Sequence, residues 1–292
     1  MTSLRSRAMP AVLRLMGRGR AYASAETARA HIEQRALHPQ LFAPPPRLRP
    51  EVKIALERRN DWPIYTVRPR NHEPERAVLY LHGGAWVNEI TPQHWQLAAR
   101  MAVGARAEVV VPIYPLVPSA TAADVLPTIV ELALEKPGGA LVGDSAGGQI
   151  ALSTAQVLRD EHNVIVPRTV LISPVVDLSL DNPDIAAVSD DPWLGRDALR
   201  VFADRWRGEW PVDEPRVSPL AGDLAGLGPL TIFTGTRDIL NPDARLLAEK
   251  AVAAGVDVDF REQPQLLHVY PLMPIPEGRA ARAIIVESLT RS

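Results

Sequence analysis

The sequence predicts an α/β fold with a mainly parallel central sheet that is covered by helices on both faces. Short apolar runs of β type alternate with longer segments of helical periodicity along most of the chain. These runs are apolar on both faces, which is typical of a sheet buried between two helical layers. The 292 residues, 46% of them hydrophobic, suffice for one large domain or two small ones.

The elements follow one another in a regular order. We predict strands at residues 62–67, 77–81, 108–114, 140–142, 169–172, 230–234 and 256–261. Helices are predicted between them at residues 95–103, 123–134, 147–159, 243–254 and 278–289. Asn241 and Pro242 are expected to begin the fourth of these helices as N-cap and first-turn residue, and Gly255 to end it. The alternation implies right-handed βαβ crossovers.

Two regions stand outside this alternation. Residues 42–50 are dense in proline and form a linker, which separates basic N-terminal helices from the rest of the chain. Residues 181–210 carry two or more helical pieces and are predicted to be an insertion over one end of the sheet. We therefore divide the chain into residues 1–50 and a main domain, residues 51–292, with an insertion at about 181–210.

Charge is distributed unevenly along the chain. The net charge is −2, but residues 1–50 hold nine arginines against Glu26 and Glu33, which gives +7 and leaves −9 on the remainder. The near-neutral total argues against a general nucleic-acid binder. The absence of cysteine excludes a disulfide scaffold, thiolate metal sites and a cysteine nucleophile. The compartment stays undecided on this ground, and we expect a cytoplasmic protein.

The basic N-terminus allows three interpretations. Its apolar residues recur at helical spacing: Leu4, Ala8, Met9, Val12, Leu13, Leu15 and Met16. Such a helix lies on a membrane, acts as a transit peptide, or packs on its own domain, and we expect the last. Arg14, Arg18 and Arg20 interrupt the apolar core that a secretory signal needs. No stretch approaches the ~20 apolar residues of a membrane span.

A serine in a glycine-rich turn is the sharpest chemical signal. The segment Gly143-x-Ser145-x-Gly147 follows a short buried strand and begins a helix. This context places the serine hydroxyl at the carboxyl edge of the sheet, as a nucleophile requires. The alternative is a chance match in a glycine-containing turn.

A second motif, His82-Gly83-Gly84, follows the strand at residues 77–81. Two glycines let main-chain N–H groups turn toward a substrate oxygen, which would stabilise an oxyanion. The alternatives are a plain loop and, for His82, a catalytic base; we expect His82 to hold the loop through hydrogen bonds.

A serine nucleophile needs a base and an acid that orients the base. Only two histidines follow Ser145, and His162 lies at a polar helix end where water solvates it. We therefore predict His268, on a loop after the last strand, as the base. Asp238 follows the strand at residues 230–234 and is predicted as the acid; Asp177 and Asp243 are the alternatives. No paired ligand spacing predicts a metal.

Together these motifs resemble the hormone-sensitive-lipase-like branch of the α/β-hydrolases, the bacterial family IV carboxylesterases. The resemblance spans about residues 60–290 and rests on residues 82–86, 143–148, 218–220, 235–240 and His268. It implies an α/β-hydrolase fold, oxyanion donors at Gly83, Gly84 and Ala146, and a helical cap from residues 1–45 and about 181–210. Two departures stand out: Ala85 replaces the usual third glycine, and residues 114–119 lack the arginine and glutamate of the family's segment.

The resemblance implies a serine carboxylesterase for short-to-medium acyl esters that needs no cofactor. Lactone hydrolysis and removal of acetyl groups from esters or amines use the same triad and stay open. Further alternatives are a membrane-surface lipase and a non-catalytic domain that binds small molecules. Trp86, Trp193 and Trp206 are expected to line the substrate pocket, or else to form the core of the cap. We expect a small-molecule ester as partner, no nucleic acid, no stable membrane insertion, and homodimers as in many relatives.

Overall fold

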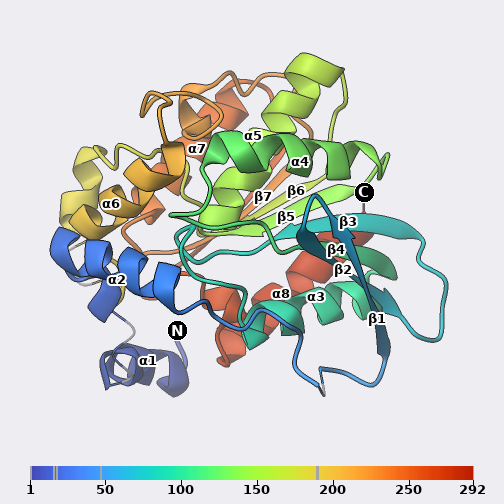
Figure 1. Ribbon diagram of the computed structural model, residues 1–292, viewed down its shortest axis with the longest axis horizontal. Helices are drawn as coiled ribbons and strands as arrows, with labels where there is room; N and C mark the ends of the chain where they lie inside the picture. Colours follow the sequence, from blue (N-terminus) through green and yellow to red (C-terminus); the bar gives the residue numbers. More distant parts are fainter. Residues whose placement is uncertain (1, 16, 18, 47, 189–190, 292) are drawn as a thin grey trace.

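The computed structural model describes residues 2–15, 17, 19–46, 48–188 and 191–291, and an eight-stranded sheet forms its centre (Figure 1). The strands are β1 Val52–Arg59, β2 Trp62–Pro69, β3 Arg76–Leu81, β4 Ala107–Pro112, β5 Ala140–Asp144, β6 Thr169–Ile172, β7 Leu230–Gly235 and β8 Val258–Gln263. Their order in the sheet is β1-β2-β4-β3-β5-β6-β7-β8. The pairings of β2 with β1 and β4 are antiparallel, and the other five are parallel. The predicted mainly parallel sheet is confirmed.

Helices cover both faces of the sheet, as predicted (Figure 1). One face carries α4 Ala122–Leu134, α5 Ala146–His162 and α7 Asn241–Ala253, and the other carries α3 Pro92–Gly104 and α8 Pro276–Thr290. Neighbouring residues of β5 belong to different cores, because successive side chains of a strand point to opposite faces. Leu141 packs in the core that contains Ile150 of α5, whereas Val142 packs in the core that contains Leu97 of α3.

The edge strand β1 is absent from the elements predicted for the sequence. Only its first residue, Val52, is buried, and the side chains that follow are exposed, among them Lys53, Glu57 and Arg58. An edge strand that carries charges is protected against pairing with other chains. Val52, Ile54 and Leu56 alternate with polar or small residues as in a strand, but Ile54 and Leu56 are exposed, and the prediction missed this element.

The start of α7 differs from the predicted cap. The helix begins at Asn241 with Leu240 at the N-cap position, so the prediction of Asn241 as N-cap is wrong. The Leu240 N–H donates to Oδ1 of Asp238 at 3.0 Å. The Asn241 side chain instead donates to Thr234 at 3.2 Å and to Glu262 at 2.8 Å. Asp238 therefore supports the helix entry with one carboxylate oxygen and keeps the other for a different partner.

The N-terminal region and the insertion lie together at one end of the sheet (Figure 1). They contain α1 Leu4–Leu15, η1 Arg20–Tyr22, α2 Ala25–Leu37, η2 Pro183–Ala187 and α6 Arg196–Arg207. Helix α2 packs against α6, and the ring of Tyr22 meets that of Phe202 edge-on at 5.5 Å. We call the described parts of residues 4–37 and 181–210 the cap, and the rest of the chain the body.

Glu277, at the start of α8, holds the N-terminus on the body. Its carboxylate accepts hydrogen bonds from the Ser3 N–H at 2.5 Å and from the hydroxyls of Ser3 and Ser6 at 2.9 and 2.6 Å. Although burial acts in the opposite direction, these donors lower the pKa of Glu277 to about 2. Leu13 of α1 is buried in the core, while Met16 lies outside the described residues. None of the helices in the described ranges is long and apolar enough to cross a membrane.

Candidate active site

Ser145 occupies the sharp turn between β5 and α5. Its φ of +52° and ψ of −118° lie in a region that residues with a Cβ rarely adopt. Both flanking glycines are required by close backbone contacts. A Cβ at Gly143 would lie 2.1 Å from the carbonyl oxygen of Gly147, and one at Gly147 would lie 2.0 Å from that of Leu81. The glycines therefore permit a turn so tight that the serine projects from the carboxyl edge of the sheet.

The three residues predicted as nucleophile, base and acid lie in one chain of hydrogen bonds. His268 Nε2 lies 3.0 Å from the Ser145 hydroxyl, and His268 Nδ1 lies 2.8 Å from Oδ2 of Asp238. All three side chains are buried. Because the carboxylate can only accept, Nδ1 carries the proton and Nε2 is left to accept the proton of the serine. This arrangement can generate an alkoxide nucleophile.

The loop that carries His268 is fixed by the ends of two parallel strands. The N–H of Val269, whose φ is +48°, donates to the hydroxyl of Ser173 directly after β6 at 3.0 Å. Gly235 at the end of β7 leaves room for this loop, since a Cβ there would lie 2.3 Å from the carbonyl oxygen of Leu266. On the cap side, the ring of Trp193 meets the His268 ring edge-on at 5.6 Å. The imidazole is thus held by body and cap together.

Negative charges make His268 a stronger base than a free imidazole. Burial disfavours the imidazolium, but the charge and hydrogen bond of Asp238, with the charges of Asp191 and Asp144, raise the pKa of His268. Asp191 belongs to the insertion and accepts a hydrogen bond from the Ile239 N–H at 3.1 Å. Burial and the nearby charge of Asp238 raise the pKa of Asp191 to about 6.

The alternative acids and base lie in other surroundings. Asp177 accepts from the N–H of Ser179, and Asp243 accepts from the side chain of Asn182. His162 is exposed at the end of α5. The carboxylate that contacts His268 is therefore that of Asp238, and not that of Asp177 or Asp243.

Three main-chain N–H groups surround the serine. Gly83 follows β3, and a Cβ on it would lie 3.0 Å from the Cβ of Ser145. Gly84 has φ +132°, and Ala146 is the first residue of α5. In the part of the chain that the structure describes, the N–H groups of Gly83, Gly84 and Ala146 donate no hydrogen bond. Free donors at a helix start and a glycine loop can bind the oxyanion of a tetrahedral intermediate.

His82 supports the loop that contains Gly83 and Gly84. Its Nδ1 lies 2.8 Å from the Gly83 carbonyl oxygen, and its ring stacks on that of Tyr114 at 4.6 Å. The Tyr114 hydroxyl donates to the His82 carbonyl oxygen. Burial, with a smaller contribution from His94, lowers the pKa of His82 to about 4. The side chain therefore stays neutral in a structural position, as expected from the sequence.

A buried carboxylate next to the nucleophile was missing from the predicted site. Asp144 accepts hydrogen bonds from the Tyr80 hydroxyl at 2.8 Å and from His94 Nε2 at 3.1 Å. His94 Nδ1 accepts from the Thr91 N–H, so its proton lies on Nε2. Burial opposes ionisation, yet these partners keep the pKa of Asp144 below its usual value. The only sequence signal was its place directly before Ser145.

Two of the three predicted pocket tryptophans belong to the core. Trp86 and Trp206 are both 1% exposed, and their rings stack at 5.8 Å with an interplanar angle of 12°. Both indole N–H groups donate to the side-chain oxygen of Gln149, at 3.2 and 2.8 Å. Among the described residues, Trp193 lines the catalytic cavity and these two do not. The pocket prediction is therefore corrected for Trp86 and Trp206.

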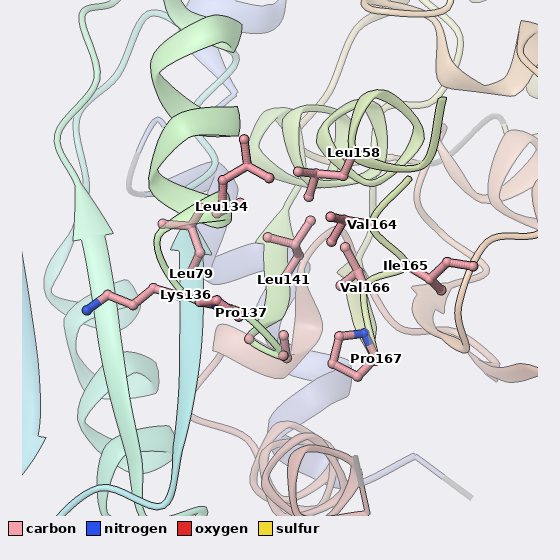
Figure 2. Close-up of a pocket in the computed structure, with 14 residues that line it drawn as sticks. Leu79, Leu134, Lys136, Pro137, Leu141, Leu158, Val164, Ile165, Val166 and Pro167 are labelled. Carbon is pink, nitrogen blue, oxygen red and sulfur yellow. The ribbon is translucent and has the colours of Figure 1, made fainter. Parts of the chain in front are cut away.

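A cavity of about 770 Å³ lies between cap and body and contains the serine. Its wall includes Ser145, His268 and the loop of Gly83, Gly84 and Ala85, which we call the oxyanion loop. Polar side chains of the cap complete the wall. A smaller cavity of about 140 Å³ lies at the amino ends of the parallel strands and is lined by apolar side chains such as Leu141 and Leu158 (Figure 2). Lys136 borders it but forms an ion pair with Glu108. The chemical groups are therefore concentrated in the first cavity.

Known proteins share this arrangement. Residues 78–272 match the family described as alpha/beta hydrolase fold, a stretch that includes Ser145, Asp238 and His268. The chain belongs to the α/β-hydrolase fold family. It is 34% identical to an acetyl-hydrolase of Streptomyces hygroscopicus over 74% of this chain and 75% of that protein. It is 30% identical to carboxylesterase NlhH of Mycobacterium tuberculosis, over 88% and 86% of the two chains.

Solved α/β-hydrolase structures agree with the sequence relatives. An esterase from the bacterial hormone-sensitive lipase family superposes with a TM-score of 0.78 at 26% identity, and covers 91% of this chain and 97% of its own. The predicted resemblance to hormone-sensitive-lipase-like esterases is thereby confirmed. No cluster of three or more His, Asp or Glu side chains in the described ranges is arranged to hold a metal ion.

Proposed function

We propose that the protein is a serine carboxylesterase that hydrolyses short-to-medium acyl esters. The observation that carries the proposal is the continuous hydrogen-bond chain from Ser145 through His268 to Asp238, beside free N–H groups of the oxyanion loop. The relatives named acetyl-hydrolase and carboxylesterase support the same reaction class.

The first half of the reaction forms an acyl-enzyme. His268 Nε2 takes the proton of the Ser145 hydroxyl as the oxygen attacks the ester carbonyl. Asp238 keeps the proton of the imidazole on Nδ1 and stabilises the imidazolium that forms. The N–H groups of Gly83, Gly84 and Ala146 hold the negative oxygen of the tetrahedral intermediate. When the intermediate collapses, the leaving alkoxide takes the proton from His268 and departs as an alcohol.

The second half releases the acid by the same groups. Water gives a proton to His268 and attacks the acyl carbon, and the oxyanion again lies against the three N–H groups. Collapse returns the proton to the Ser145 oxygen and frees the carboxylic acid. All steps use side chains and main-chain groups of this chain.

Lactone hydrolysis and removal of acetyl groups from esters or amines remain the second candidates, because they use the same triad. Similarity to the Streptomyces acetyl-hydrolase favours short acyl groups within this set. A non-catalytic binding domain is disfavoured, since Ser145, His268 and Asp238 are all present and joined by hydrogen bonds. A chain-length series of p-nitrophenyl esters, with lactones and N-acetylated amines beside it, distinguishes the candidates. The cytoplasmic location and the homodimer stay predictions.

Replacement of the nucleophile tests the proposal. In Ser145→Ala, kcat/KM for p-nitrophenyl acetate is expected to fall by about 10⁴–10⁶, because the triad acts as a unit. Ser288→Ala is the matched control, because Ser288 is buried in α8 and bonds only to a carbonyl of its own helix. Circular dichroism checks that both variants fold. Turnover by Ser145→Ala at the wild-type rate would exclude the mechanism.

A further inference from the structure

Two arginines line the cap side of the catalytic cavity. Arg35 lies on α2, one turn after His31, and Arg20 lies on η1. Neither forms an ion pair with any residue in the described part of the chain. A guanidinium is charged at all physiological pH values. The cap therefore brings positive charge to the cavity that no carboxylate among the described residues neutralises by direct contact.

Asn88 holds Arg35 in place. The Asn88 side-chain oxygen accepts from Arg35 Nε at 3.2 Å and lies 2.8 Å from His31 Nε2. Its amide nitrogen donates to the Tyr22 hydroxyl and to the Gly84 carbonyl oxygen, both at 3.2 Å. Three of these contacts join Asn88 to the cap, and the fourth joins Asn88 to the oxyanion loop. Arg35 thus uses Nε for positioning, while its two terminal nitrogens donate no hydrogen bond within the described residues.

The other titratable groups of the cavity leave this positive charge in excess. Asp144 keeps its negative charge beside the nucleophile, where it accepts a hydrogen bond from His94, so it offsets one of the two arginine charges. Burial raises the pKa of Glu89 to about 7, so this carboxyl is partly neutral near neutral pH. Burial also lowers the pKa of His31, which therefore adds a neutral ring. The charge that remains at the cap end is that of the arginines.

We propose that Arg35, assisted by Arg20, forms an anion subsite at the cap end of the cavity. The substrates that fit this site are esters that carry a carboxylate at the end remote from the scissile bond. The fork of a guanidinium matches a carboxylate with two parallel hydrogen bonds. A cavity of about 770 Å³ can enclose both the reacting ester and such a distal group. This inference rests on the proposed ester hydrolysis by Ser145.

Paired esters with and without a carboxylate test the subsite. p-Nitrophenyl hydrogen glutarate against p-nitrophenyl valerate places the carboxylate on the acyl side. para-Acetoxybenzoate against its methyl ester places it on the alcohol side. We expect kcat/KM at low ionic strength to favour the acidic member of at least one pair by about tenfold, as a charge-assisted bidentate contact permits. Added salt should reduce this preference.

Variants of α2 assign the preference to Arg35. Arg35→Gln should lower the ratio of kcat/KM for the acidic ester to kcat/KM for its neutral partner to about one, and circular dichroism checks that the variant folds. Arg29→Gln is the matched control, because Arg29 is an exposed arginine of the same helix outside the cavity wall. A preference that survives in Arg35→Gln, or no preference in either pair, would overturn the subsite but not the esterase. If the wild type hydrolyses none of the four esters, the proposed function itself fails.

Discussion

At the scale of single residues, reactivity arises from one strained position and the charges around it. Ser145 adopts a φ of +52° in the turn between β5 and α5, where Gly143 and Gly147 make close backbone contacts. A conformation of this kind costs about 1–3 kcal/mol, which the surrounding packing must supply. The turn places the hydroxyl 3.0 Å from His268 Nε2 before any substrate binds. Binding energy is then free to act on the transition state rather than on assembly of the site.

The raised pKa of His268 predicts the pH dependence of the reaction. Only neutral His268 can accept the serine proton, so activity is lost as the pH falls through its pKa. Asp238, Asp191 and Asp144 raise this pKa above 6.5 despite burial. The acidic limb of kcat/KM against pH should therefore have its midpoint above pH 6.5. A midpoint at or below this value in a stopped-flow or spectrophotometric series would contradict the electrostatic account.

The contribution of Asp191 can be separated from that of the triad. Asp191→Asn removes a negative charge near His268 and keeps one oxygen, which can accept either from the Ile239 N–H or from the N–H groups of Trp193 and Leu194. We expect the acidic midpoint to shift down by about 0.3–1 pH unit, with little change in the limiting rate. Asp181→Asn is the charge-matched control, since Asp181 is an exposed residue of the insertion paired with arginines. Equal profiles for wild type and Asp191→Asn would refute this role.

The sequence predicts those site residues whose roles depend on their immediate neighbours in the chain. Gly143, Ser145 and Gly147 were predictable because their spacing expresses a steric requirement within five consecutive residues. The contact of Asp144 with His94 was not, because it joins residues 50 positions apart and depends on how α3 lies against β5. Asp191 was not predictable either, because it contacts the loop that carries Asp238 only through the placement of the insertion.

At the scale of elements, burial decided which predictions succeeded. Strands that are apolar on both faces and the helices between them were predicted close to their observed bounds. The strand β1 was missed although Val52, Ile54 and Leu56 alternate along it. After Val52 none of its side chains is fully buried, and the strand is defined by its pairing with β2. The wrong N-cap at Asn241 has a similar cause. Leu240 is the N-cap residue, and the contact that supports the helix entry is the hydrogen bond from its N–H to Asp238.

The corrected place of Trp206 gives a stability prediction. Trp206 of α6 stacks on Trp86 and donates to Gln149, which joins the cap to α5 behind the oxyanion loop. Trp206→Ala should lower the free energy of unfolding by about 3–5 kcal/mol, because it removes a large buried side chain. The KM for p-nitrophenyl acetate should stay within about twofold, since this ring does not border the cavity.

Trp210→Ala provides the comparison in urea titrations. Trp210 is only partly buried and lies under the guanidinium of Arg216, so its loss should cost about 1 kcal/mol. The core assignment of Trp206 fails if its variant is no less stable than Trp210→Ala, or if only KM changes.

At the scale of the whole molecule, the structure shows where part of the positive charge of residues 1–50 lies. Residues 1–50 carry +7, and part of this charge lies on the cap side of the catalytic cavity through Arg20 and Arg35. Composition alone could not distinguish this arrangement from a targeting segment or a membrane-binding helix. In the structure, α2 packs against α6 of the insertion and α1 is attached to α8.

That attachment depends on one carboxylate and can be weakened selectively. Glu277→Gln replaces the ion that accepts from Ser3 and Ser6. We expect trypsin to cleave within α1 several times faster, because docking of α1 is weakened while the triad in the body stays assembled. The KM for short esters should rise, because Met9 and Leu13 of α1 line the catalytic cavity. Glu287→Gln, an exposed residue of the same helix paired with Arg291, is the control. Equal cleavage rates in both variants would show that other contacts hold α1.

Covalent labelling tests the central claim most directly, because it identifies the nucleophilic atom without depending on the choice of substrate. Diethyl p-nitrophenyl phosphate should transfer one diethylphosphoryl group to the protein, and peptide mass spectrometry should locate it on Ser145. Labelling should be lost in Ser145→Ala and strongly slowed in His268→Ala, since the base no longer activates the hydroxyl. A label on any other residue, or equal labelling of the His268→Ala variant, would contradict the triad described above.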